Sequence, residues 1–309
     1  MLEVFAPEGI PEVTAGTDLA ELAAPFVSEG DVLVVTSKVV SKAEGRVVER
    51  DREQAIRDET VRVVARRGPT SIVETRLGVV MAAAGVDASN VAAGRVVLLP
   101  VDPDASARRL RESLAAVAGV NVAVIVTDTA GRAWRHGQTD LALGVAGMVP
   151  MESFEGAVDA YGNTLAVTAP AVADEIAGIA EVATGKLGGR PFTVLRGLAD
   201  RVLPRGDHGA GARVLVREAG SDMFGLGSRE AVVAALAGRD RQAFGAAAAA
   251  EDLVRALTEC GLPAALAGDT VRVDVARSDL RVTTLAFAHG WDVDADLSSN
   301  STTVLAPLS

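Results

Sequence analysis

Two hydroxyls and a carboxylate directly follow a strongly apolar segment near the middle of the chain. Residues 122–126 are apolar and mostly β-branched, which is typical of a buried strand, and Thr127, Asp128 and Thr129 come next. In α/β sheets, ligands usually bind at the carboxyl ends of the strands. The sequence therefore predicts a binding site at Asp128 and Thr129.

Cationic and aromatic side chains follow a few positions later. Arg132, Trp134 and Arg135 stand close together in a chain with only 3% aromatic residues, so their clustering is unusual. A planar guanidinium binds phosphate or carboxylate through two hydrogen bonds. We expect Arg132 and Arg135 to hold an anionic substrate. The alternative is a structural ion pair with Asp140 or Asp159.

Two more apolar segments end in polar side chains of the same kinds. Ser37 and Lys42 follow the predicted strand 31–36, and Asp87 and Asn90 follow an apolar segment at 78–84. Carboxylates and hydroxyls without His or Cys suit hard cations such as Mg²⁺ or Mn²⁺. Lysine and asparagine beside such ions would neutralise and orient nucleotide phosphates.

Each of these patterns also has a plainer interpretation. The stretch 37–46 lacks the glycines of a P-loop, and its lysines would equally suit a solvent-exposed turn. Asp87 begins the tetrapeptide DASN, whose composition is typical of a turn. The residue pattern alone leaves the metal–nucleotide site and the turns open.

Composition limits the classes of function. The chain has 309 residues and is 49% hydrophobic, enough for one large or two ordinary domains with a substantial core. With 41 acidic and 30 basic residues it carries −11, which argues against nucleic acid or an anionic membrane as main partner. The single cysteine, Cys260, excludes an internal disulfide. Because no targeting segment or membrane span is visible, we expect a cytoplasmic protein.

Strands that alternate with helices predict an α/β fold. We expect helices at 18–28 (with Thr17 as cap), 54–67, 103–119 and 171–183, and further strands at 2–5, 96–99, 165–168 and 192–195. Beyond about residue 220 the pattern predicts two Ala-rich helices, a strand, a third helix and a closing strand. We therefore expect a domain at 1–220 and a small appended α/β module of unknown role at 221–309.

Six stretches resemble, in order, the successive motifs of one family. They are VLVVTSKVVSKAEGRVV, IVETRLGVVMAAAGVDASNV, VLLPVDPDASARRLR, VTDTAGRAWRHGQTDLALG, DAYGNTLAVTAPAVADEIAGIAE and GKLGGRPFTVLRG. Over about residues 1–220 the chain is similar to the CofE-type coenzyme F420 γ-glutamyl ligases.

This resemblance implies an activity, a fold and an assembly. The activity is GTP-dependent addition of L-glutamate to the lactyl carboxylate of the deazaflavin precursor F420-0, through an acyl phosphate, with release of GDP and phosphate. Further γ-linked glutamates can follow. The implied fold is a two-part α/β ligase fold, and the implied assembly is a homodimer. GTP is the implied cosubstrate, with two Mg²⁺ or Mn²⁺ ions per site and K⁺ as a further candidate.

The resemblance also implies roles for individual residues. The expected nucleotide contacts are Ile10, Pro11, Glu12, Val13, Ser37, Lys42, Asn90, Gly185 and Lys186. The expected metal ligands are Asp87, Asp128 and Thr129. The residues expected to act in catalysis are Lys42, Asp87, Asp128 and Arg132.

One position departs from the family pattern. Many relatives carry a metal-binding Gln directly after the glycine that matches Gly185, where this chain has Lys186. An ammonium group cannot ligate a cation, so we expect Lys186 to hold a phosphate and the second metal to have fewer protein ligands. The tail shows no match to the flavin-binding domain of two-domain relatives, so no flavin function is expected.

Two other classes of function remain open. One is another metal- and nucleotide-dependent carboxylate ligase or phosphotransferase, which would turn over GTP with a different acid. The other is a non-catalytic GTP-binding subunit, which Lys186 favours and the intact Lys42, Asp87, Asn90 and Asp128 oppose.

Overall fold

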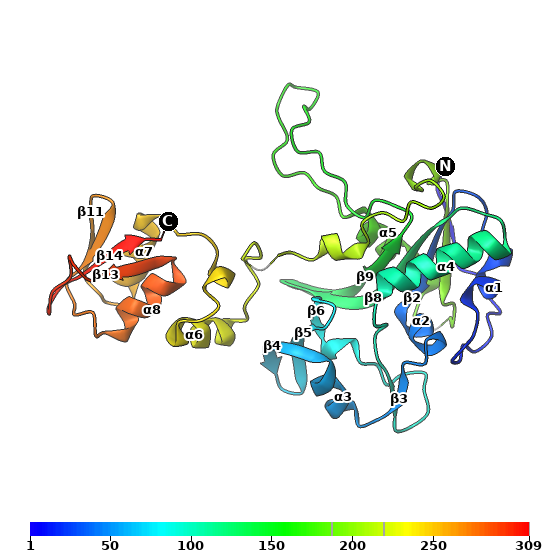
Figure 1. The fold of residues 1–309 in the computed structure, drawn as a ribbon, viewed down its shortest axis with the longest axis horizontal. Coiled ribbons are helices and arrows are strands. Elements are labelled where there is room, and N and C mark those ends of the chain that lie inside the picture. Colours follow the sequence, from blue (N-terminus) through cyan, green and yellow to red (C-terminus); the bar gives the residue numbers. More distant parts are fainter. Residues whose placement is uncertain (187, 219, 309) are drawn as a thin grey trace. The chain divides into compact units, whose positions relative to one another are not determined.

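The computed structural model describes residues 1–186, 188–218 and 220–308. It shows an α/β protein, as predicted, that divides into two compact units (Figure 1). The larger unit comprises Met1–Val63 and Gly68–Val216. The smaller unit comprises Val64–Arg67 and the chain from Arg217 onward.

The larger unit is built on a sheet with strand order β1-β10-β2-β8-β9. These strands span Glu3–Phe5 (β1), Phe192–Arg196 (β10), Val32–Thr36 (β2), Ala123–Arg132 (β8) and Arg135–Ala146 (β9). The central pair β2 and β8 is parallel, whereas the other neighbours are antiparallel. The carboxyl ends of β2 and β8 therefore lie at the same edge of the sheet, as the strand-end argument requires.

Helices cover both faces of this sheet, because successive residues of its strands point to opposite sides. Leu33 of β2 packs in one core cluster with Leu114 of α4 (Pro103–Val117), and α1 (Leu19–Ala23) joins that cluster. Val34 packs on the other side with Ile176 of α5 (Val172–Thr184). Burial of a Val, Leu or Ile side chain contributes about 1.5–3 kcal/mol, so these two clusters fix the strand ends in place.

Strand β8 is longer than predicted. The sequence analysis ended this strand before Thr127, but β8 continues to Arg132 and forms a hairpin with β9. A register shift between Val126 and Thr127 interrupts that pairing, and the parallel pairing with β2 stops at Thr127. Asp128 therefore lies within β8, one residue beyond the last pair of the parallel β2–β8 ladder, and the prediction that its own strand ends before it is wrong.

The helix predicted at 54–67 is wrong in its second half. Helix α3 spans Arg52–Glu59, and strand β4 follows at Thr60–Arg67. The cause is the cluster of β-branched residues Thr60, Val61, Val63 and Val64, which favour strands. The remaining strands of this part of the chain are β3 (Val47–Glu49), β5 (Thr70–Thr75), β6 (Val80–Ala82) and β7 (Arg95–Val97).

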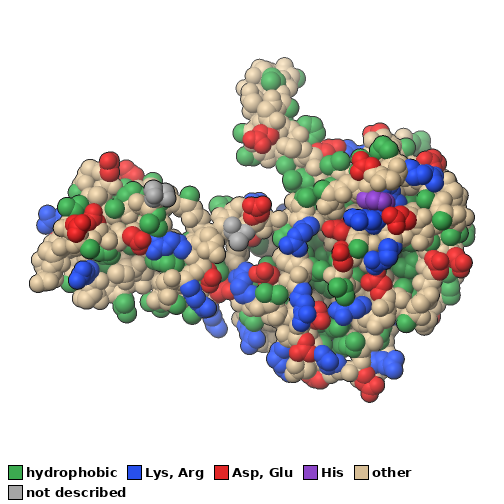
Figure 2. All heavy atoms as spheres, viewed as in Figure 1, with side chains coloured by type: hydrophobic (Ala, Val, Ile, Leu, Met, Phe, Trp, Pro, Cys, Tyr) green, Lys and Arg blue, Asp and Glu red, His purple; other side chains and the backbone are tan. Residues whose placement is uncertain are grey.

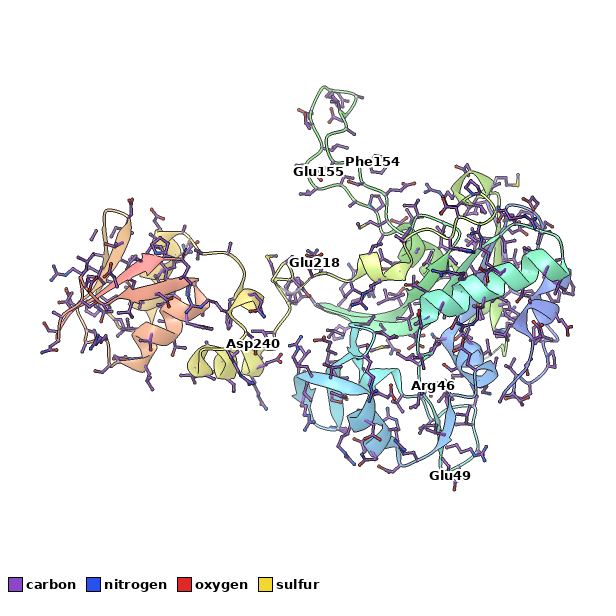
Figure 3. The ribbon with its side chains drawn as sticks, viewed as in Figure 1. Arg46, Glu49, Phe154, Glu155, Glu218 and Asp240 are labelled. Carbon is purple, nitrogen blue, oxygen red and sulfur yellow. The ribbon has the colours of Figure 1, made fainter. Side chains whose placement is uncertain are left out.

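Two other local predictions also need correction. The first helix is shorter than expected, because Pro25 follows its end, and its cap is Asp18 rather than Thr17. The strand predicted at 165–168 does not form. Residues 151–170 instead make a segment of mostly irregular structure that projects from the larger unit, with Phe154 and Glu155 near its base (Figure 3).

The smaller unit has its own core. Its helices are α6 (Ser228–Ala237), α7 (Ala250–Glu259) and α8 (Leu280–Ala288), and its antiparallel sheet has the order β11-β12-β14-β13. These strands span Ala264–Ala267 (β11), Thr270–Val273 (β12), Thr303–Pro307 (β14) and Trp291–Asp294 (β13). Leu253, Leu257, Val273, Val282 and Leu305 are completely or almost completely buried together.

The visible surface of the larger unit carries charged side chains of both signs (Figure 2). Figure 2 shows acidic and basic side chains interspersed over the visible face of the larger unit. Within the described residues, none of the helices combines the length and apolar character needed to cross a membrane.

Candidate active site

A cavity of about 860 Å³ opens in the larger unit at the carboxyl end of β2, beside Thr127, Asp128 and Thr129 of β8. It brings together most of the residues that the sequence analysis predicted, although they come from distant parts of the chain. These lining residues are Ile10, Pro11, Glu12, Val13, Lys42, Asp87, Asn90, Asp128, Thr129, Gly185 and Lys186.

Ser37 and Lys42 lie on α2 (Ser37–Ala43), which begins directly after β2. Ser37 is buried, and its hydroxyl donates a hydrogen bond to Asp128 Oδ1 at 3.1 Å. Lys42 is also buried, and its Nζ pairs with Glu12 Oε1 at 2.5 Å. The solvent-exposed turn that composition favoured for 37–46 is therefore wrong, because residues 37–43 form a helix and its lysines, Lys38 and Lys42, line the cavity.

Asp87 lies at the cavity wall beside the ammonium group of Lys38, with 2.5 Å between Oδ2 and Nζ. Its carboxylate also accepts hydrogen bonds from the backbone N–H and the hydroxyl of Ser89. Burial opposes ionisation, but Lys38 and Ser89 stabilise the carboxylate and hold the pKa of Asp87 below its usual value. The turn predicted at Asp87 is present, and the same carboxylate faces the cavity.

Asp128 is in the opposite electrostatic situation. Burial raises the pKa of its carboxyl group to about 7, and the negative charges of Asp140 and Asp87 add to the increase. Hydrogen bonds from the Ser37 hydroxyl and the Thr129 backbone act against this rise but do not cancel it. At neutral pH this carboxyl group is therefore only partly ionised.

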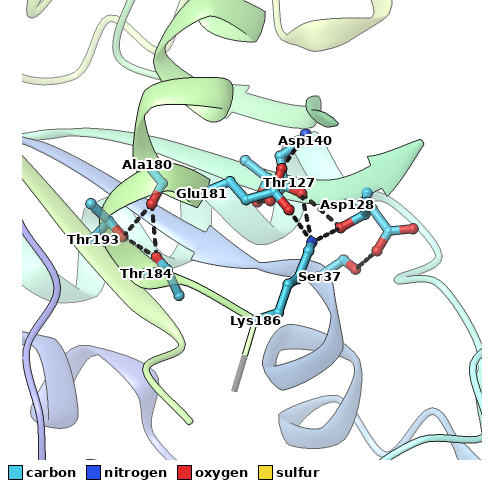
Figure 4. Close-up of polar contacts among 10 residues, drawn as sticks. Ser37, Thr127, Asp128, Asp140, Ala180, Glu181, Thr184, Lys186 and Thr193 are labelled. Atoms are coloured by element: carbon cyan, nitrogen blue, oxygen red, sulfur yellow. Dashed lines mark hydrogen bonds and ion pairs between the residues drawn. The ribbon is translucent and has the colours of Figure 1, made fainter. Parts of the chain in front are cut away.

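Two acidic residues that the sequence analysis did not assign to the site complete it (Figure 4). Asp140 accepts hydrogen bonds from the hydroxyls of Thr127 at 3.1 Å and Thr129 at 2.7 Å. Lys186 Nζ donates to Thr129 Oγ1 at 2.8 Å, lies 3.8 Å from Asp140 Oδ1 and pairs with Glu181. Burial and the charge of Glu181 raise the pKa of Asp140 above its usual value.

Only the hairpin register could have revealed Asp140 in the sequence. It lies opposite Thr129 across the β8–β9 pair, and its carboxylate binds the two threonines of the TDT stretch. Glu181 is contributed by α5, and nothing in its local sequence distinguishes it from the other acidic residues of that helix. Lys38 and Arg190 also line the cavity.

The predicted arginines lie elsewhere. Arg132 and Arg135 are exposed at the turn of the β8–β9 hairpin and are not among the described residues that line the cavity. Arg132 Nη2 donates to the His136 carbonyl at 3.4 Å. The alternative ion pairs are not formed either: Asp140 binds hydroxyls near Lys186, and Asp159 binds Asn163. Substrate binding by Arg132 and Arg135 stays a prediction.

The donor set fits a hard cation shared with a phosphate. Across residues 1–186, 188–218 and 220–308, no three His, Cys, Asp or Glu side chains stand close enough to hold a metal ion by themselves. Mg²⁺ typically binds one or two protein carboxylates and takes its remaining ligands from water and substrate phosphates. Asp128, with Asp87 in the same cavity, offers that partial set.

Comparisons with known proteins agree with this chemistry. A family model described as F420-0:Gamma-glutamyl ligase matches residues 9–55 and 49–197. A coenzyme F420:L-glutamate ligase of Archaeoglobus fulgidus is 42% identical over 219 residues, which cover 64% of this chain and 88% of the relative. Enzymes with the same description from Methanopyrus kandleri and Haloarcula marismortui are 39% and 36% identical, and the matches cover 93% and 98% of those relatives. In this chain, those two matches cover 69% and 74% of the length.

Proposed function

This chain belongs to the F420-0:Gamma-glutamyl ligase family and is a ligase, and from that premise we propose that it uses GTP to join L-glutamate to F420-0. The bond would form at the terminal carboxylate of this deazaflavin precursor. The main support is the convergence of Asp87, Asp128, Lys42 and Asn90 on one cavity at the carboxyl end of β2. Sequence motifs that are far apart thereby form one site suited to phosphates.

The proposed reaction has two steps. A carboxylate oxygen of the precursor attacks the γ-phosphorus of GTP, and the bond from that phosphorus to the β–γ bridging oxygen breaks, which releases GDP. The amine of glutamate then attacks the acyl carbon of the resulting acyl phosphate and loses a proton. The carbon–oxygen bond to phosphate breaks, so an amide forms and phosphate leaves.

Residues of the cavity have distinct tasks in this proposal. Lys42 binds a phosphate, since its buried ammonium group pairs with the exposed Glu12, which a phosphate can displace. Asn90 orients the nucleotide, and Ser37 fixes the Asp128 carboxylate by its hydrogen bond. Pre-positioned charges of this kind account for most of the catalysis in phosphoryl transfer, because the protein forms few covalent bonds.

Asp87 and Asp128 would hold Mg²⁺ or Mn²⁺. A divalent ion bound there would offset the charge that collects on the phosphates during transfer. Burial, with a smaller contribution from the charges of Asp140 and Asp87, raises the pKa of Asp128, and a bound cation would offset both effects.

A homodimer is part of the proposal. The projecting segment 151–170 presents Tyr161 and Val167 almost fully to solvent, at 93% and 91% exposure. Exposed apolar side chains on a projecting segment are typical of a protein contact. Analytical ultracentrifugation is expected to show a dimer that dissociates more readily in the double variant Tyr161→Ser, Val167→Ser. A fully active wild-type monomer would contradict this assembly.

The test of the activity is a GDP-release assay with GTP, Mn²⁺, L-glutamate and F420-0, followed by mass spectrometry of the product. We expect the mass of one or more glutamyl units to be added, and Asp87→Ala and Asp128→Ala to abolish the gain. Asp200→Ala is the matched control, because that aspartate is exposed and outside the cavity. GTP turnover only with a different acid would refute the substrate assignment, and GTP binding without turnover would refute the activity.

A further inference from the structure

The ammonium group of Lys186 lies where a cation would be expected. It contacts the Thr129 hydroxyl and the Glu181 carboxylate and lies 3.8 Å from Asp140 Oδ1. These groups belong to an acidic cluster, which consists of Asp87, Asp128, Asp140 and Glu181. All four residues line the same cavity. Lys186 therefore occupies the end of this cluster that Asp140 and Glu181 form.

The oxygens around Lys186 are already engaged. The Thr129 hydroxyl donates its only proton to Asp140 and accepts a hydrogen bond from Lys186. Asp140 accepts from the hydroxyls of both Thr127 and Thr129. Glu181 accepts from the backbone N–H of Asp140 and pairs with Lys186. A metal ion at this end of the cluster would have to displace the ammonium group and break some of these hydrogen bonds.

The other end of the cluster is different. Asp128 accepts a hydrogen bond at 3.1 Å from the hydroxyl of Ser37, which is a neutral group. The two ends therefore differ in the partners of their carboxylates. Lys186 lies at Asp140 and Glu181, whereas at the other end Asp128 is bound by a neutral hydroxyl and Asp87 pairs with Lys38.

We propose that Lys186 replaces the second divalent cation, so that each active site binds one metal ion, at Asp87 and Asp128. The inference rests on the proposed function, which supplies the metal-dependent use of this site. It also changes the role expected for Lys186, because the ammonium group that was predicted to hold a phosphate is bound by carboxylates. A fixed cation of this kind neutralises charge but offers no Lewis-acid coordination.

Counting bound Mn²⁺ tests the proposal without any activity measurement. Equilibrium dialysis against Mn²⁺ and GDP is expected to give one Mn²⁺ per wild-type chain and two per Lys186→Gln chain. Glutamine is one bond shorter than lysine, is neutral and offers an amide oxygen as a metal ligand. Electron paramagnetic resonance should show spin coupling only in Lys186→Gln, because paired catalytic metals lie about 4 Å apart.

The matched control is Lys186→Arg, which keeps the positive charge and should still bind one Mn²⁺. The Lys186 side chain is 60% exposed, so these variants are expected to fold, and thermal melting checks this. Two Mn²⁺ in the wild type, or only one in a folded Lys186→Gln, would overturn the inference. No bound Mn²⁺ in the wild type would refute the metal site of the proposed function as well. One bound Mn²⁺ without ligase activity would refute the proposed activity alone.

Discussion

Replacing Asp128 by Asn should make the metal-free protein more stable while it removes the activity. Asn has the same shape, and its amide oxygen can still accept the hydrogen bond from Ser37. The change removes only the negative charge, which in the wild type is buried and repelled by Asp87 and Asp140. The expected gain in stability therefore measures how much the buried charge of Asp128 destabilises the folded state when no cation is bound.

The magnitude follows from the pKa of Asp128, which is raised from 3.8 to about 7. One pKa unit corresponds to about 1.4 kcal/mol, so the ionised carboxylate costs the folded state at most about 4 kcal/mol. Between the two pKa values the folded state holds a proton that the unfolded chain has released, so the free energy of unfolding falls as the pH rises. Above pH 7 both states are ionised and the deficit is constant.

The assay is thermal and denaturant unfolding of both proteins in EDTA at several pH values. We expect Asp128→Asn to be more stable at pH 8, and the difference to shrink toward zero near pH 4. Added Mn²⁺ should stabilise the wild type and leave the variant unchanged, because a ligand stabilises only the state that binds it. Asp200→Asn is the control for a mere loss of charge. Equal or lower stability of Asp128→Asn at pH 8 would refute the reasoning.

Three further predictions concern the nucleotide site and its scaffold. Lys42→Met removes the buried ammonium group beside Glu12 and should lower kcat/KM for GTP on the order of 100-fold, with an unchanged melting temperature. Steady-state kinetics at saturating F420-0 measures this, and an unchanged kcat/KM would exclude a phosphate contact. Leu114→Ala leaves a cavity at a fully buried position between α4 and β8 and should lower the free energy of unfolding by about 2–5 kcal/mol in urea titrations. Gly144→Ala should distort β9 and lower stability by about 1–3 kcal/mol, because its new Cβ would lie 2.2 Å from the Pro103 carbonyl oxygen. Gly131→Ala, whose Cβ would meet nothing within 4 Å, serves as the control and should melt like the wild type.

The local sequence was sufficient to predict the two parallel strands, β2 and β8, and the start of helix α4. The apolar segments at 31–36 and 122–126 predicted the two parallel strands, since their side chains are buried on both faces. Asp102 and Pro103 predicted the start of α4, where the Asp102 carboxylate accepts from the Ala105 N–H. At 54–67 the same kind of signal was insufficient, because helix-forming and β-branched residues follow each other without a breaker.

The sequence by itself determined the α/β class and, through the strand-end rule and the motifs, the placement of Asp87, Asp128 and Lys42 in one site. Tertiary structure alone decided which charges surround them. Asp140 reaches Thr129 only through the register of a hairpin. Glu181 reaches the Asp140 backbone, and Lys186 reaches Thr129, only because α5 packs against the sheet. These contacts depend on pairings between distant segments. The balance between repulsion at Asp128 and neutralisation at Lys186 therefore arises from the packed fold and not from any local pattern.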